Sequence, residues 1–280
     1  VALRSFIDSV GLALKCLGLE EGDSCAISVL SPEIYSEAFR RNGIKPYLVD
    51  VDDEMMVDSE AVKAGLDKGV KAVLYFEPLG LLPSSMESIK SIGIPVIEDI
   101  TESIGSVYSS IKPGVIGDIV IAATEEDSIV STAGGAVLLS DNEEYLSIMK
   151  KEVSDYSPFI ELADMNAALG IVQLDKLPSI VQRRSSIYDI YLDEARKRNR
   201  VKVFGSGGID LEVNGYGFCC IINDRPDEAI QLAQKYQVTI RKTFSKAIGA
   251  RYQDRFDRFP KAVPALSRGV SFPLYPFLSA

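Results

Sequence analysis

Hydrophobic and polar positions follow two alternating patterns along the first half of the chain. Apolar residues recur at three- and four-residue steps over residues 10–19, which predicts a helix, and the unbroken apolar run at 25–30 predicts a buried strand. The two patterns then repeat in turn. Further predicted helices cover residues 32–42, 59–66 and 85–91, and further predicted strands cover 46–49, 72–76 and 94–97. Strict alternation of strands and helices predicts an α/β fold, a mostly parallel sheet with helices on both faces.

The pattern changes after Asp118. The apolar runs at 119–123 and 136–139 are separated by too few residues for a helix, so they predict a hairpin-like excursion that ends in Gly134-Gly135. A long helical pattern over 163–198 follows, and we expect Pro178 to interrupt it. Strand patterns at 218–222 and 238–241 then flank a helical pattern at 227–236. We therefore expect a large α/β domain over residues 1–200 and a small α+β domain over residues 201–280.

Composition narrows the classes of function. Among 280 residues, 46% are hydrophobic and the net charge is −10, which suits a soluble globular protein and disfavours nucleic acid as a partner. No apolar stretch approaches the ~20 residues that span a bilayer, so we expect no membrane segment and a cytoplasmic location. The four cysteines show no CxxC spacing and the chain has no histidine, which argues against a zinc site and a Cys-His nucleophile. We expect no metal.

Asp99 is the first candidate for a functional residue. Ligands of open α/β sheets bind beyond the carboxyl ends of the strands, and Asp99 follows the strand predicted at 94–97. An alternative is that its carboxylate only caps the turn at Thr101 and Glu102.

Several sequence blocks resemble one known family. They are Leu12–Leu19 with Gly22-Asp23, Asn42–Asp52, Ile94–Gly105, Gly117–Ile119, Ala167–Gly170 with Gln173-Leu174, Phe259–Ala262 and Ser271–Pro276. In this order they resemble the DegT/StrS family of sugar-nucleotide aminotransferases, which use pyridoxal phosphate (PLP). The resemblance covers nearly the whole chain. It implies a fold-type-I aminotransferase-like structure, a homodimer and a place in polysaccharide or surface-glycan biosynthesis. The family's domain begins before residue 1 of this chain, so its N-terminal arm is missing from the resemblance.

The residues that the family uses for PLP chemistry are replaced here. The position of the lysine that holds PLP as a Schiff base falls on Asp127 or Ser128, and residues 120–132 contain no lysine. The phosphate-binding Gly-Thr falls on Phe6-Ile7, where the bulk of Phe6 removes the close backbone approach. The aromatic residue that stacks on the cofactor ring aligns with Pro32.

Other positions of the family pattern differ as well. The phosphate-binding serine upstream of the lysine falls on Ala122 or Ala123, and a segment that reaches the neighbouring subunit falls on residues 159–162. Asp99 keeps the position that pairs with the pyridine nitrogen, but Glu102 replaces a Gln or His beside it. A charged Glu102 would repel the cofactor's phenolate. With these partners gone, we favour turn capping for Asp99.

These departures predict a catalytically degenerate member, a pseudoenzyme without cofactor or catalytic residue. Its vestigial cleft would comprise Ser31, Pro32, Asp99, Glu102, Asp127 and Ser128. The ligand would be a sugar-nucleotide, or the partner an active paralogue or another protein. Two alternatives stay open. One is an active PLP-dependent aminotransferase or a lysine-independent sugar-modifying enzyme, and the other is a non-PLP enzyme that uses the carboxylates of the cleft. We expect Lys112, Lys242 and Lys246 to be solvated surface lysines away from the cleft.

Overall fold

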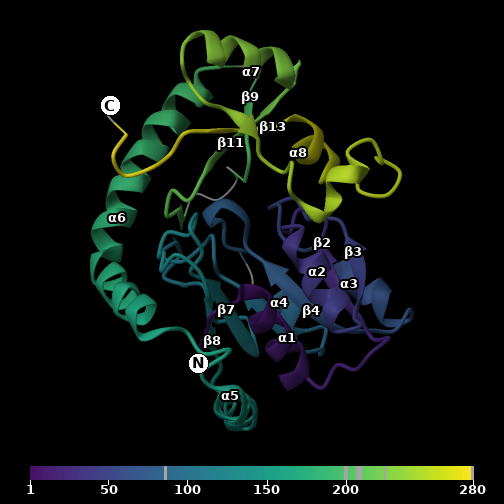
Figure 1. Cartoon of the computed structure of the whole chain (residues 1–280). Coiled ribbons are helices and arrows are strands. Elements are labelled where there is room, and N and C mark those ends of the chain that lie inside the picture. Colours follow the sequence, from purple (N-terminus) through teal and green to yellow (C-terminus); the bar gives the residue numbers. More distant parts are fainter. Residues whose placement is uncertain (85–86, 199–200, 206–209, 224, 279–280) are drawn as a thin grey trace.

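The computed structural model describes residues 1–84, 87–198, 201–205, 210–223 and 225–278 (Figure 1). Its main sheet, within those residues, has seven strands in the order β1-β8-β7-β5-β4-β2-β3. The strands are β1 (Ala2–Leu3), β2 (Ser24–Ser28), β3 (Lys45–Val49), β4 (Val70–Phe76), β5 (Val96–Asp99), β7 (Ile119–Ala123) and β8 (Ala136–Leu139). Strands β3, β2, β4, β5 and β7 pair in parallel, whereas β8 runs antiparallel to both β7 and β1. The predicted mostly parallel sheet and its terminal hairpin are confirmed.

Both faces of the main sheet are covered because its central strands are apolar on both sides. Along β4, Val73 and Tyr75 belong to one core cluster, and Leu74 and Phe76 belong to the other. The Leu74 cluster includes residues of α1 (Phe6–Cys16) and α2 (Ile34–Arg41), and the Val73 cluster includes residues of α3 (Ser59–Leu66) and α4 (Glu87–Lys90). Helices on both faces are therefore confirmed, as the continuous apolar strands required.

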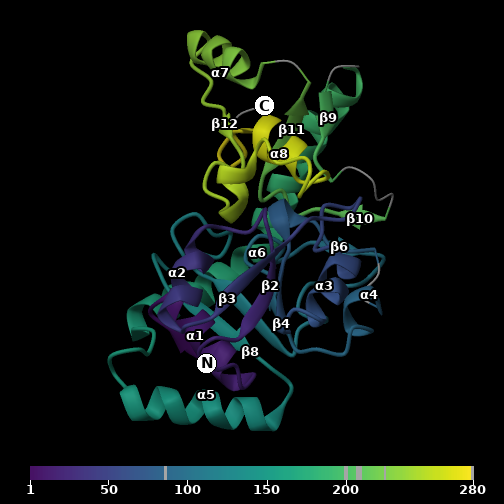
Figure 2. The ribbon, with the colours of Figure 1, turned by 90° about the vertical axis from the view of Figure 1, so that its right-hand side faces the viewer.

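A second sheet lies beyond the long helix of the chain. It is antiparallel, with the order β12-β13-β11-β9. Its strands are β9 (Val201–Val203), β11 (Phe218–Ile222), β12 (Arg241–Lys242) and β13 (Gly269–Phe272), and its helices are α7 (Pro226–Lys235) and α8 (Val263–Arg268). Figure 2 shows this C-terminal region at one end of the molecule and the main sheet at the other. The division between residues 200 and 201 into two domains remains our proposal.

The strand predicted at 238–241 is wrong in all but its last residue. The Val238 N–H instead bonds to the Ala233 carbonyl at 3.0 Å, and Gln237 adopts a φ of 59°. This arrangement closes the end of α7 with a left-handed residue, which satisfies carbonyls that the helix end leaves free. Val238 therefore belongs to the turn that ends α7, and the strand β12 begins only at Arg241.

One helix joins the two sheets. Helix α6 (Asp164–Arg196, 33 residues) runs along one side of the molecule in Figure 1 and continues through Pro178, so the predicted interruption is wrong. Its first turn is tied to the hairpin of the main sheet by the Asn166 side chain, which donates to the Thr132 carbonyl at 2.6 Å. Its last turns are tied to the C-terminal region by Tyr191, whose hydroxyl donates to the Pro273 carbonyl at 2.9 Å. Anchors on both sides of Pro178 offset the cost of one missing helix hydrogen bond.

The remaining elements are short or peripheral. They are α5 (Glu143–Tyr156), the pair β6 (Val107–Tyr108) and β10 (Leu211–Glu212), and the 3-10 helices η1 (Pro78–Gly80) and η2 (Ile248–Tyr252). Over the part of the chain that the structure describes, no helix combines the length and apolar character that crossing a bilayer requires.

Candidate functional site

A cleft of about 440 Å³ lies between the carboxyl edge of the main sheet and the C-terminal region. From the main sheet come Leu79 beyond β4, Glu102 beyond β5 and Asp127 beyond β7. The opposite wall comes from the C-terminal region, from residues 216–217, 239, 241–243, 245–246 and 271–275. A cavity of about 140 Å³ shares Leu79 and Glu102 with this cleft and is also lined by Pro32. Parallel strands bring their ends to one edge, which explains how residues from distant segments meet here.

Asp99 lies beneath this edge and is closed off by its own neighbours. Its side chain is 1% exposed, and it is absent from the lining of the cleft. One carboxylate oxygen accepts the Tyr35 hydroxyl at 2.5 Å, and the other accepts the Thr101 N–H at 2.9 Å and also the Thr101 hydroxyl. Burial raises the pKa of Asp99, against the hydrogen bonds from Thr101 and Tyr35 that lower it. Asp99 thus caps the turn at Thr101 and has no oxygen left without a donor.

Aromatic side chains fill the space around Tyr35. Tyr35 is fully buried, and Phe6 packs edge-on against it with ring centroids 5.4 Å apart. Phe6 stands at the first position of α1, whose start is capped by Ser5: the Ser5 side chain accepts the Asp8 N–H at 3.2 Å. The cap places Phe6 at the head of the helix, where its ring points into the core and is 6% exposed.

The loop between β7 and β8 carries Asp127 and Ser128. Its base is tied by Thr132, whose N–H donates to the Thr124 carbonyl at 2.9 Å and whose hydroxyl donates to the Gly134 carbonyl at 2.6 Å. Gly135 has a φ of 104°, and a Cβ there would lie 2.6 Å from the Leu3 carbonyl oxygen, so glycine is required. Asp127 is exposed and lines the cleft, whereas Ser128 is half-buried and outside its lining.

Glu102 is a titratable side chain that lines both the cleft and the smaller cavity. Its carboxylate accepts the Leu79 N–H at 2.7 Å, and Leu79 holds a left-handed conformation with a φ of 55°. Burial raises the pKa of Glu102 to about 8, the charge of Asp99 acts in the same direction, and the Leu79 amide and the Tyr216 hydroxyl oppose the rise. At neutral pH Glu102 is therefore mainly a neutral acid that can donate a hydrogen bond.

Three cations line the wall opposite Glu102. They are Arg241, Lys242 and Lys246, from the segment that follows α7. Lys242 forms an ion pair with Asp227 at 3.0 Å. Arg241 and Lys246 are exposed and have no ion pair with any residue that the structure describes. The expectation that Lys242 and Lys246 lie away from the cleft is thus wrong, because the C-terminal region folds back over the sheet edge; Lys112 is absent from the lining.

The residues present do not fit PLP in the position that the resemblance implies. The Asp99 carboxylate would have to accept a hydrogen bond from the pyridine nitrogen of PLP. One of its oxygens already accepts the Tyr35 hydroxyl, and Phe6 fills the space against the Tyr35 ring. No lysine stands in the loop at 120–132. Ser31 is buried, with a hydroxyl that has no partner among the described residues, and Pro32 lines the smaller cavity.

A pair of buried carboxyl groups lies behind the site. Glu98 accepts three backbone N–H groups, from Gly114, Ile116 and Gly117, at 2.7–2.8 Å. Glu77 is fully buried, and burial followed by the charge of Glu98 raises its pKa well above the usual range. Sequence patterns gave no indication of this pair, or of Tyr35 as the partner of Asp99. Among the described residues, no group of three or more His, Cys, Asp or Glu side chains is arranged to hold a metal ion.

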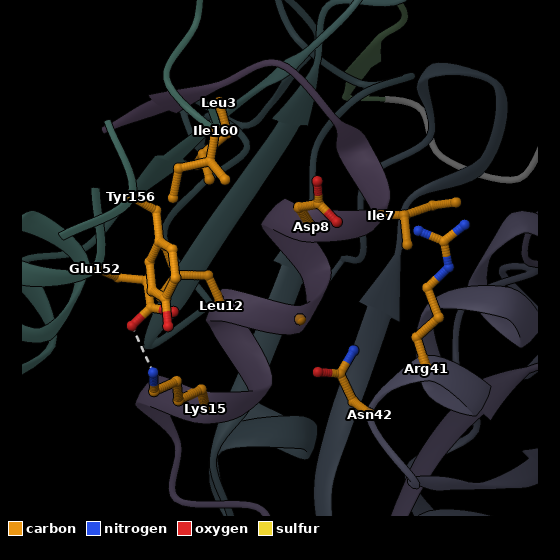
Figure 3. Close-up of a pocket in the computed structure, with 11 residues that line it drawn as sticks. Leu3, Ile7, Asp8, Leu12, Lys15, Arg41, Asn42, Glu152, Tyr156 and Ile160 are labelled. Atoms are coloured by element: carbon orange, nitrogen blue, oxygen red, sulfur yellow. Dashed lines mark hydrogen bonds and ion pairs between the residues drawn. The ribbon is translucent and has the colours of Figure 1, made fainter. Parts of the chain in front are cut away.

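A second hollow, of about 310 Å³, lies on the outer side of α1 (Figure 3). Its walls come from α1, α5 and the end of α2, and both of its cations have partners: Lys15 pairs with Glu152 at 2.5 Å and Arg41 with Glu37 at 2.8 Å. Since these charges are already neutralised, this hollow offers less for an ionic ligand than the cleft does.

The arrangement of both sheets matches known proteins. The model of the DegT/DnrJ/EryC1/StrS aminotransferase family matches residues 1–280. GDP-perosamine synthase of Escherichia coli O157:H7 is 26% identical over an alignment of 290 positions, which covers 96% of this chain and 78% of that protein. The aminotransferase TlmJ from Streptoalloteichus hindustanus superposes with a TM-score of 0.87 at 20% identity, over 100% of this chain and 81% of that one. The E. coli GDP-4-keto-6-deoxy-D-mannose-3-dehydratase with bound hydrated PLP superposes with a TM-score of 0.83 at 18% identity, over 99% and 83%.

Proposed function

Starting from the fact that this chain belongs to the DegT/DnrJ/EryC1/StrS aminotransferase family, we propose that it is a member without PLP chemistry, which keeps the scaffold as a binding protein. Its ligand or partner is a sugar-nucleotide or a protein such as an active paralogue, and its setting is cytoplasmic polysaccharide or surface-glycan biosynthesis. The glycan setting is supported by the similarity to GDP-perosamine synthase, whose name denotes a nucleotide-linked sugar.

One observation carries this proposal: the protein's own side chains occupy the hydrogen-bonding capacity that a cofactor would need. Tyr35 and Thr101 saturate the Asp99 carboxylate, and this closed arrangement is nearly free of solvent contact. A ring nitrogen of PLP would have to displace the Tyr35 hydroxyl from a buried acceptor, which costs about 1–3 kcal/mol before any gain. The missing lysine removes the covalent attachment as well.

A PLP titration tests the proposal directly. The purified protein is titrated while its near-ultraviolet and visible absorbance is recorded, and it is then reduced with borohydride and examined by mass spectrometry. We expect no saturable absorbance band and no increase in protein mass, whereas an active aminotransferase treated in parallel shows both. A saturable band with a lysine adduct would contradict the proposal and restore transamination as the function. A saturable band without an adduct would favour a lysine-independent sugar-modifying enzyme.

The same family membership leads us to propose a homodimer. Several large apolar side chains are exposed near the start of α6, a pattern typical of protein interfaces. Phe159 and Met165 are each 83% exposed and Ile171 is 63% exposed. Analytical ultracentrifugation is expected to show a dimer, and the pair Phe159→Asp and Ile171→Asp is expected to yield monomers. Tyr236→Asp, at an aromatic side chain that is 75% exposed and follows α7, is the matched control. A monomeric native chain would contradict this part of the proposal.

A second candidate is a non-PLP enzyme that uses the carboxylates of the cleft. It is favoured by one observation: Glu102 and Asp127 line the same cavity, where burial raises the pKa of Glu102. Asp99 does not take part, because it lies outside the lining. Turnover of a nucleotide-sugar by the PLP-free protein, abolished in Glu102→Gln, would replace the binding function by this one.

A further inference from the structure

The two buried carboxyl groups behind the cleft stand on neighbouring strands. Glu77 follows β4 directly, and Glu98 lies in β5, where the parallel register places it opposite Tyr75. The Glu77 N–H donates to the Asp99 carbonyl at 3.3 Å, so Glu77 continues the line of β4. Alternate residues of a strand share a face of the sheet, which puts Glu77 and Glu98 on the same face as diagonal neighbours. Both side chains are 0% exposed.

The backbone around Glu98 provides donors for a carboxylate. Its two oxygens accept the N–H groups of Gly114, Ile116 and Gly117 at 2.7–2.8 Å. A Cβ at Gly117 would lie 2.7 Å from the Cβ of Glu98, so the loop can come this close only with glycine there. Three N–H donors stabilise a negative charge and oppose a proton on the same group. The charge of the pair therefore belongs to Glu98.

Glu77 lacks such donors. One of its oxygens accepts the Ser103 hydroxyl, and the other, Oε1, has no hydrogen-bond partner among the described residues. The carboxyl group of Glu98 lies within hydrogen-bonding reach of Glu77. Two carboxylates cannot bond to each other, because each can only accept. A proton on Oε1 would supply the missing donor, and it would remove a charge that burial penalises.

The surroundings of Glu77 offer no counter-ion within the described part of the chain. No described lysine or arginine forms an ion pair with either carboxyl group. The titratable groups around the pair are acids and a phenol: Glu98 and Asp99 on β5, Tyr75 on β4, and Asp52 and Glu54 on the side of Tyr75. Burial, and after it the charge of Glu98, raises the pKa of Glu77 well above its usual range, which agrees with this geometry. An ionised Glu77 would stand among like charges.

A hydrogen bond between the two groups would join two segments of the sheet edge. Glu77 leads directly into η1, whose Leu79 lines the cleft, and the loop at 114–117 surrounds the Glu98 carboxylate. If this edge opened, Glu77 would meet water and ionise above the ordinary glutamate pKa of about 4.3. The hydrogen bond could not form again until a proton returned. Opening would therefore become easier as the pH rises.

We propose that Glu77 keeps its proton in the folded protein and donates it to Glu98, and that this one shared proton fastens the end of β4 to the loop at 114–117, so that this sheet edge opens more easily as the pH rises. The inference goes beyond the proposed function, because it concerns a site behind the cleft and requires neither a ligand nor the absence of PLP.

The first test counts protons by comparing the native protein with Glu77→Gln. The glutamine keeps a donor toward Glu98 and an acceptor for the Ser103 hydroxyl, but it cannot ionise. A carboxyl group with a raised folded pKa stabilises the protein fully below the unfolded pKa of about 4.3, and this stabilisation is lost as the pH rises toward the folded pKa. In urea denaturation at pH 6, 7 and 8, we expect the unfolding equilibrium constant of the native protein, divided by that of Glu77→Gln, to rise about tenfold per pH unit.

Glu33→Gln, at an exposed glutamate, is the matched control for this comparison. The ratio of its unfolding constant to that of the native protein is expected to be the same at all three pH values. If the ratio for Glu77→Gln were constant as well, Glu77 would be ionised in the folded protein and the inference would be overturned.

Glu98→Gln tests which of the two carboxyl groups holds the proton. Its NH₂ group would face backbone N–H groups that need an acceptor. At pH 7 we expect an unfolding constant about tenfold to a hundredfold larger than that of Glu77→Gln, and a chain that fails to fold agrees with this expectation. Equal unfolding constants for the two variants would place the proton on Glu98 and overturn the assignment. The proton count with Glu77→Gln does not depend on the folding of Glu98→Gln.

Hydrogen exchange locates the effect in the structure. The native protein and Glu77→Gln are compared at the same pH, so that the intrinsic exchange rate of each amide cancels. In peptides from residues 75–84 and 111–118, the ratio of the native rate to the variant rate is expected to rise about tenfold between pH 7 and pH 8. Peptides from α7 are expected to give a ratio of about one at both pH values. A ratio in the first two segments that did not change with pH would show that the proton does not fasten this edge.

Discussion

Two regions at the same edge of the main sheet differ in how their polar groups are satisfied. Around Asp99, each polar oxygen has an internal donor, and Phe6 and Tyr35 fill the surrounding space. Around Glu102, cations and hydroxyl groups line an open cleft, and Arg241 and Lys246 have no ion-pair partner among the described residues. The regions lie three residues apart along the chain. The first region is part of the core, and the second has the unmet charge and hydrogen-bonding capacity that a ligand site needs.

Under the function proposed above, the Asp99 region takes no ligand and the Glu102 region does. The hydrophobic and hydroxyl groups around Asp99 satisfy each other, which stabilises the protein without a ligand. The Glu102 region lacks such closure, and it holds a left-handed Leu79 and a carboxyl group with a raised pKa. Strained backbone and perturbed pKa values concentrate where binding or chemistry takes place.

The largest expected effect comes from emptying the closed region. Tyr35→Ala removes a fully buried aromatic side chain and its hydrogen bond to Asp99, and it is expected to lower the free energy of unfolding by about 3–5 kcal/mol. Urea denaturation measures the change. Tyr236→Ala, at a side chain that is 75% exposed, is the control and is expected to stay within about 0.5 kcal/mol. A loss below 1 kcal/mol in Tyr35→Ala would show that the region is not tightly closed.

The next largest effect concerns Glu102 in the open region, whose contribution to stability is expected to depend on pH. Folded Glu102 binds its proton more tightly than the unfolded chain, where the pKa of glutamate is about 4.3. The contribution of Glu102 to the stability of the protein therefore falls as pH rises from about 4.3 to the folded pKa of about 8, and it changes no further above that. Glu102→Gln lacks this penalty.

We expect the stability of Glu102→Gln relative to the native protein to increase by about 2–4 kcal/mol between pH 5 and pH 9. Urea denaturation at pH 5, 7 and 9 measures this difference. Asp127→Asn changes an exposed carboxylate in the same cleft. Its unfolding free energy is expected to differ from that of the native protein by the same amount at all three pH values. If the unfolding free energies of Glu102→Gln and the native protein also differed by the same amount at all three pH values, Glu102 would be ionised from pH 5 to pH 9.

A smaller effect isolates the hydrogen bond of the closed region. Tyr35→Phe keeps the ring and removes the hydroxyl that donates to Asp99, leaving one buried carboxylate oxygen without a donor. The expected loss of unfolding free energy is about 1–3 kcal/mol. Because an unpaired carboxylate favours its protonated form, the loss is expected to shrink as the pH falls from 7 to 4. If the loss of unfolding free energy in Tyr35→Phe did not change with pH, it would come from altered packing and not from the hydrogen bond to Asp99.

The smallest expected effect tests whether the closed region can be reopened by one residue. Ser128→Lys restores a lysine in the loop between β7 and β8, and it is expected to change stability by less than about 1 kcal/mol. It is expected to give no borohydride-stable adduct with PLP, because Tyr35 and Phe6 still fill the region around Asp99. An adduct on the introduced lysine would show that Tyr35 and Phe6 do not prevent PLP from binding, and it would contradict the proposed function.

Much of the main sheet could be predicted because its strands and helices have different hydrophobic patterns. The strands are apolar on both faces, whereas the helices that cover them are apolar on one face only. The limits of α3 and the hairpin at Ile119–Ala123 and Ala136–Leu139 were found as the structure has them. Helix α5 was missed because Met149 is its only fully buried residue, so it lacks a strong apolar period. Its start carries a local signal, Asn142, whose side chain accepts the Glu144 N–H at 2.8 Å.

The candidate site was less accessible to sequence patterns. Asp99 and Glu102 could be singled out from their place after a strand, but the partner of Asp99 is Tyr35, 64 residues away. The cations of the cleft are more than 130 residues from Glu102 in the chain and reach it only because the C-terminal region folds back over the sheet edge. Spacing along a chain does not report such contacts, so the distant lysines resembled ordinary surface residues.

The length of the helix between the two sheets sets the distance and orientation between them. With 33 residues at 1.5 Å each, α6 is about 50 Å long, and it is pinned by Asn166 near one end and Tyr191 near the other. One residue inserted between these pins would rotate everything beyond it by about 100° and move it along the axis by 1.5 Å. Arg241 and Lys246 would then no longer face Glu102. Although much of α6 is exposed, its number of residues is constrained, because the alignment of the two cleft walls depends on its length.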